Sequence, residues 1–81
     1  MRVKIKDNGQ TFTAISYYDV VLFLWQNSFQ KEPTIEEFML NYARRSVMVS
    51  NENIRATSVK EFVDDLESLG HLTISDRVGL N

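Results

Sequence analysis

The chain has no cysteine, and it has only one histidine, one proline and three glycines. Without cysteine it can form no disulfide and no thiolate metal site, and it has no cysteine nucleophile. His71 follows Gly70 at the expected end of a helix, where we expect it to assist the helix terminus and not to bind a metal. The sequence therefore predicts a protein without metal or cofactor that is not an enzyme.

Long hydrophobic runs are missing as well. The longest unbroken apolar run, residues 20–25, is far shorter than the roughly 20 residues that a membrane-spanning helix requires. Near the first residue, basic side chains alternate with Val3 and Ile5, so no continuous apolar signal region follows. The net charge of −2 gives no overall attraction to nucleic acid. We expect one soluble cytoplasmic domain over residues 1–81, without membrane association.

The first 14 residues predict a β-hairpin. Asn8-Gly9 is typical of a two-residue type I′ turn. Around such a turn Ile5 faces Phe12 and Val3 faces Ala14, which gives the hairpin one apolar and one polar face. Turn chemistry and hydrophobic alternation therefore indicate the same register.

Three segments then begin with a helix-capping residue that is followed three positions later by an acid: Ser16 with Asp19, Thr34 with Glu37, and Ser58 with Glu61. They predict helices over residues 16–28, from 34 to at least 45, and over 58–69, where Gly70 ends the third helix. Residues 46–50 fit either a last helical turn or a short strand. Residues 72–75 alternate as a strand. The predicted fold class is α+β: an N-terminal β-hairpin, three helices and a short C-terminal strand.

The run Leu66-Glu67-Ser68-Leu69-Gly70-His71-Leu72-Thr73-Ile74, preceded by three helices, resembles the winged helix-turn-helix superfamily. In that superfamily the third helix commonly ends in a Leu-x-x-Leu-Gly turn that leads into a wing strand. The resemblance covers residues 16–75 and implies a winged-helix-like fold that binds DNA. The third helix departs from the pattern because its outward side is acidic, and carboxylates repel the phosphate backbone.

Two charged surfaces are candidate sites. The acidic one, a candidate for protein binding, is formed by Glu61, Asp64, Asp65 and Glu67. It fits docking of a basic protein, as on a phage- or plasmid-type inhibitor that imitates nucleic acid, and it also fits an ordinary solvated helix face. The basic one, a candidate for nucleic-acid binding, consists of Arg2, Lys4 and Lys6 on the outer hairpin face, extended by Arg44, Arg45 and Arg55. Its other interpretation is a hairpin edge that lysines protect from aggregation.

Aromatic residues at helix ends are a third candidate. We expect Trp25 and Tyr42 in the core, and Tyr17, Tyr18 and Phe29 nearer the surface, where they would mark a partner or homodimer contact. Together these patterns favour a non-catalytic regulatory or inhibitory module that binds a protein partner, with a homodimer among the outcomes. The alternative is a DNA-binding regulator of winged-helix type that uses the basic hairpin with Arg44, Arg45 and Arg55.

Overall fold

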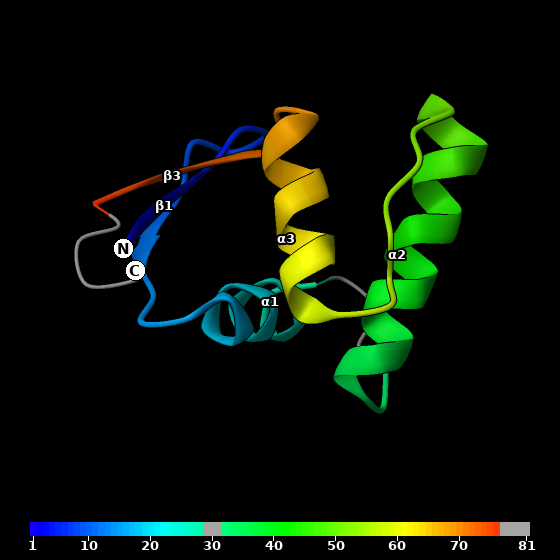
Figure 1. Ribbon diagram of the computed structural model, residues 1–81, viewed down its shortest axis with the longest axis horizontal. Coiled ribbons are helices and arrows are strands. Elements are labelled where there is room, and N and C mark those ends of the chain that lie inside the picture. The colour runs from blue at the N-terminus through cyan, green and yellow to red at the C-terminus, as the bar shows by residue number, and fades with distance from the viewer. Residues whose placement is uncertain (29–31, 77–81) are drawn as a thin grey trace.

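The chain folds into a three-stranded antiparallel sheet and three helices, as the computed structural model shows for residues 1–28 and 32–76. The elements are β1 (Arg2–Ile5), β2 (Thr11–Thr13), α1 (Tyr17–Gln26), α2 (Ile35–Ser50), α3 (Val59–Ser68) and β3 (Leu72–Ser75). Figure 1 shows α3 between the sheet and α2, with α1 across one end of both helices. The α+β prediction is confirmed. In the described stretches, no helix combines the length and the apolar character that crossing a membrane requires.

The hairpin forms, but the predicted register is wrong by two residues. Val3 lies opposite Phe12, not Ala14. The Ile5 N–H donates to the Gln10 carbonyl at 2.8 Å and the Gly9 N–H to the Ile5 carbonyl at 2.9 Å, so residues 6–9 form the connection, with Gly9 at φ +68°. A shift by an even number keeps every side chain on its predicted face.

The sheet has the order β2-β1-β3, because β3 pairs with the free side of β1. β1 is therefore the central strand of the sheet. Its inward residue Val3 is fully buried opposite Ile74, while Arg2 and Lys4 are exposed on the other face. The inner face of the sheet is a wall of the core, and the outer face is polar.

All three predicted capping residues cap their helices. Ser16, Thr34 and Ser58 each accept a hydrogen bond from the backbone N–H three residues later, at 3.3, 3.1 and 3.1 Å. Each of these bonds satisfies a donor that the first turn of a helix leaves without a partner. α1 ends at Gln26, two residues before its predicted end, and Phe29 lies outside the described residues.

Residues 46–50 are helical, which decides between the two structures that the sequence left open. α2 continues to Ser50 and ends at Asn51, which takes the left-handed conformation with φ 54°. The N–H groups of Asn51 and Glu52 donate to the carbonyls of Val47 and Ser46, at 3.0 and 3.1 Å. The bond from Asn51 to Val47 is that of a left-handed helix cap, with asparagine in the place that glycine usually takes.

The core lies between the sheet and the helices. Its largest fully buried side chains are Phe38, Phe62, Leu66, Val3, Val20, Val21 and Val63. The rings of Phe38, Tyr42 and Phe62 pack edge-on or tilted between α2 and α3, with centroids 5.5 to 6.2 Å apart. Phe12 of β2 stacks on Phe23 of α1 at 3.8 Å. Ring contacts therefore connect α2 to α3, and the hairpin to α1.

Candidate functional site

The acidic side of α3 is largely paired within the chain. Arg55 lies before α3 and donates from Nε and Nη2 to the two carboxylate oxygens of Asp65, at 3.0 and 2.9 Å. Its backbone N–H donates to Asp65 at 2.8 Å, and its Nη1 lies 3.0 Å from Glu61. Lys60 pairs with Asp64, one turn further along α3, at 2.7 Å. Glu61, Asp64 and Asp65 therefore each have a cationic partner.

These pairings also change the ionisation of the groups. Hydrogen bonds from Arg55 lower the pKa of Asp65, and the same contact raises the pKa of Arg55. The hydrogen bond from the Thr57 hydroxyl is the main cause that lowers the pKa of Glu61, and the positive charge of Arg55 lowers it further. The hydrogen bond to Asp64 raises the pKa of Lys60. With four carboxylates and two cations, this side of α3 carries a net charge of −2, half of what its acids alone suggest.

The basic residues of the hairpin gather on the outer face of the sheet. Arg2 and Lys4 project from the central strand, and Lys6 is exposed in the loop that follows. Hydroxyl residues lie opposite the two strand cations on both sides: Thr11, Thr13, Thr73 and Ser75. Because β1 is paired on both sides, Arg2 and Lys4 lie on the central strand, and the free edge of the hairpin is β2. Cations flanked by hydroxyls suit phosphate oxygens.

The other three predicted basic residues do not extend this face. Arg55 is bound to the acids of α3. Arg45 lies 3.7 Å from the carboxylate of Glu32, and its guanidinium carbon is 6.0 Å from the centre of the Tyr42 ring. Arg44 is on α2, which α3 separates from the sheet in Figure 1. The six candidates therefore lie in three separate places: the outer face of the sheet, the acidic side of α3, and α2.

Glu32 is a buried carboxylate that no sequence pattern singled out. Asn41 donates to its Oε2 at 3.2 Å, and the guanidinium group of Arg45 lies 3.7 Å from the same oxygen. The Glu32 carbonyl accepts a hydrogen bond from the indole N–H of Trp25 at 2.8 Å. Glu32 thus joins α1 to the middle of α2. Its place in a polar connector before Pro33 carries no sequence signal for this role.

α2 exposes apolar side chains on the side away from the core. Leu40 and Val47 are each 46% exposed and Met48 is 83% exposed. Arg44 lies midway between Leu40 and Met48, and Glu36 lies one turn before Leu40, so all five share one side of the helix. No ion pair among the described residues involves Glu36 or Arg44. These five residues are the outward face of α2.

The aromatic candidates at helix ends differ from one another. Tyr17 packs against the core, whereas Tyr18 is 52% exposed beside Ile15, which is 80% exposed. Trp25 and Tyr42 are partly buried against the core, as predicted. Tyr18 is thus the one of the two tyrosines on α1 that stands at the surface.

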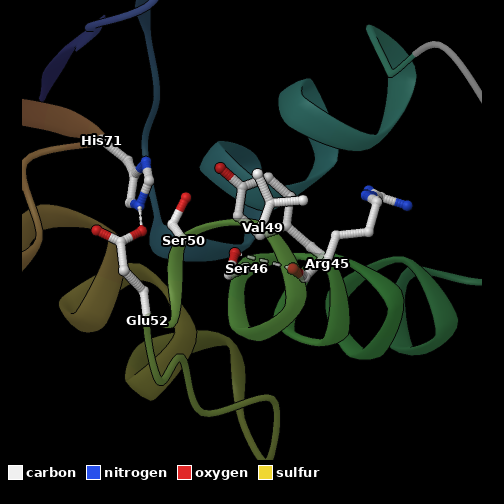
Figure 2. A pocket seen from close by; sticks show the side chains of 7 residues that line it. Arg45, Ser46, Val49, Ser50, Glu52 and His71 are labelled. Carbon is white, nitrogen blue, oxygen red and sulfur yellow. Dashed lines mark hydrogen bonds and ion pairs between the residues drawn. The ribbon is translucent and has the colours of Figure 1, made fainter.

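A hollow of about 240 Å³ lies between the end of α2 and the start of β3. Figure 2 shows the imidazole of His71 pointing at the carboxylate of Glu52, and their atoms are 2.7 Å apart. Val49, 83% exposed, forms an apolar part of its wall. Burial, and to a lesser degree the charge of Asp7, raise the pKa of Tyr42, which also lines the hollow.

Several polar groups of this hollow make contacts within the fold. His71 bridges the α3–β3 turn to the segment after α2 through Glu52. The Ser46 hydroxyl donates to the Tyr42 carbonyl at 2.9 Å, one turn back along α2. Among the described residues, no group of three or more His, Asp or Glu side chains is placed to hold a metal ion. The hollow therefore lies where packed elements meet, and part of its rim is apolar.

Comparison with known proteins places the chain in no family. No family model matches it, and neither a curated protein nor a solved structure matches it.

Proposed function

We propose that this chain is a non-catalytic regulatory module that acts by binding a protein partner through the outward face of α2. One observation carries the proposal: Leu40, Val47 and Met48 are exposed on one side of a helix whose opposite side is in the core. Clustered apolar side chains around a charged residue are typical of the centre of a protein interface.

The surroundings of α2 support this location over the acidic side of α3. The acids of α3 already have partners in Arg55 and Lys60, so a basic protein would have to compete with intramolecular ion pairs. Glu36 and Arg44 have no such partner among the described residues. The rings of Phe38, Tyr42 and Phe62 fix α2 to α3, so the outward face is presented on a rigid element.

The test is photo-crosslinking from position 48 in cells that express the chain, followed by identification and purification of the crosslinked protein. We expect the purified partner to bind the wild type, and Leu40→Asp to weaken binding at least tenfold because it places a charge at the apolar centre. Thr13→Asp, which adds the same charge on the sheet, is the matched control and should bind normally. If Leu40→Asp leaves the affinity for the purified partner unchanged, the proposal is refuted.

A second candidate function is binding of a nucleic-acid backbone by the outer face of the sheet. The central position of β1, which places Arg2 and Lys4 on the central strand of the sheet, favours it. Three cations predict that the logarithm of the affinity falls with the logarithm of the salt concentration with a slope no steeper than about −2.7. A mobility-shift series over salt concentration checks this. Lys4→Glu should abolish the shift and Lys60→Glu should retain it, whereas no shift at low salt contradicts the candidate.

A further inference from the structure

The pattern of charge and apolarity on α2 is self-complementary, and this indicates what covers its outward face. Glu36 and Arg44 are each four residues from Leu40, in opposite directions. Residues spaced by four lie along one line on a helix, so the line reads acid, leucine, base. Val47 follows Leu40 by seven residues, which is two helical turns, and falls on the same side of the helix.

We propose that the partner of the outward face of α2 is a second copy of this chain, packed antiparallel about a two-fold axis at Leu40. This rests on the proposed function and names its partner. A two-fold axis brings the same surface of both copies together, so each residue before Leu40 meets the one equally far after it. Leu40 then packs on Leu40 of the second copy, and Glu36 meets Arg44.

Charge decides the direction of the two helices. A parallel pair about the same residue would place Glu36 on Glu36 and Arg44 on Arg44, which repel. The antiparallel pair converts both into attractions and occurs twice by symmetry. Glu36 and Arg44 are two turns apart on one helix, too far to pair with each other, and neither is paired elsewhere in residues 1–28 and 32–76.

Exposure agrees with this geometry. Glu36, Leu40, Arg44 and Val47, which form the contact, are all exposed. The flanks of the contact, Glu37 and Met48, are also exposed and offer a polar and an apolar border. One face of a 16-residue helix is at the small end of interface sizes, so we expect a reversible dimer with a dissociation constant in the micromolar range or weaker.

The test is sedimentation velocity of the whole chain over rising protein concentration, at low ionic strength. We expect the wild type to move from monomer to dimer. Glu36→Arg and Arg44→Glu should each weaken dimerisation by about five- to thirtyfold, since each creates two like-charge contacts across the axis. The double variant E36R/R44E restores both pairs in reversed order and should dimerise as the wild type does. Circular dichroism confirms that these exposed substitutions leave the fold intact.

Asp64→Arg is the matched control, because it reverses a charge on α3 and should leave dimerisation unchanged. A monomeric wild type, a double variant that fails to recover, or an equal loss in Asp64→Arg each overturns the inference. A monomer that still binds a different protein in a Leu40-dependent way overturns only the second copy as partner. A monomer that binds no protein through Leu40 overturns the proposed function as well.

Discussion

The ring cluster between α2 and α3 sets how firmly the outward face is held, and Phe62→Leu measures it. Phe62 is fully buried, with its ring edge-on to Tyr42 at 5.5 Å and to Phe38 at 6.2 Å. Leucine keeps an apolar side chain at the position and removes the ring. The substitution therefore removes the aromatic contacts that join the two helices.

The expected loss follows from the two ring pairs. Each edge-to-face pair contributes about 0.5–1.5 kcal/mol beyond burial, so we expect Phe62→Leu to lower the free energy of unfolding by about 1–3 kcal/mol. A domain of this size has a total stability of about 4–12 kcal/mol, so the variant stays folded. The melting temperature should fall by about 4–8 °C for each kcal/mol lost.

Urea unfolding followed by circular dichroism is the assay. The urea concentration at the midpoint should fall. The slope of the unfolding free energy against urea concentration should stay constant, because the surface exposed on unfolding hardly changes. Tyr18→Leu is the control: Tyr18 is half exposed, and the change should stay within about 0.5 kcal/mol. An equally small change in Phe62→Leu would refute the claim that the rings fix α2 to the rest of the fold.

Three further substitutions test local features. Ser58→Ala removes the cap acceptor that lies 3.1 Å from the Glu61 N–H and should cost about 1 kcal/mol in thermal unfolding, with exposed Ser75→Ala as a neutral control; an equal melting temperature would contradict the cap. Because Arg55 lowers the pKa of Asp65, the stability from this pair is complete above the ordinary aspartate pKa of 3.8 and is lost as the pH falls through the lowered value in the folded state. Asp65→Asn should flatten the dependence of stability on pH in that acidic range, and a curve parallel to the wild type would contradict the pairing. Gly70→Ala should cost about 1–2 kcal/mol through backbone strain alone, since φ is +81° and no atom lies within 4 Å of the added Cβ; an unchanged urea midpoint would argue against the left-handed turn.

The elements were predictable from the sequence because their signals are local. The caps at Ser16, Thr34 and Ser58 act on N–H groups three residues away, and Gly70 ends α3 by its own backbone angle. Asn51 carried a similar signal for the end of α2, because asparagine tolerates the left-handed conformation.

What could not be predicted depends on contacts between distant segments. Asn8-Gly9 indicated a turn, but its length follows from hydrogen bonds that join Ile5 to Gly9 and Gln10. The pairing of β3 with β1, which makes the basic strand central, joins the two ends of the described chain. The acids of α3 looked unpaired because their main partner, Arg55, comes from an irregular segment before the helix. The resemblance to the winged helix-turn-helix superfamily stays a prediction.

The central claim is that two copies of the chain associate through the outward face of α2 and not through the acidic side of α3. Its most direct test is the ¹⁵N NMR spectrum of the whole chain, recorded over rising protein concentration. The account predicts that the amide shifts that change belong to the outward face of α2, centred on Leu40 and Arg44, while those of Glu61 and Asp64 stay constant. Changes centred on α3, or a spectrum that is the same at every concentration, would contradict it.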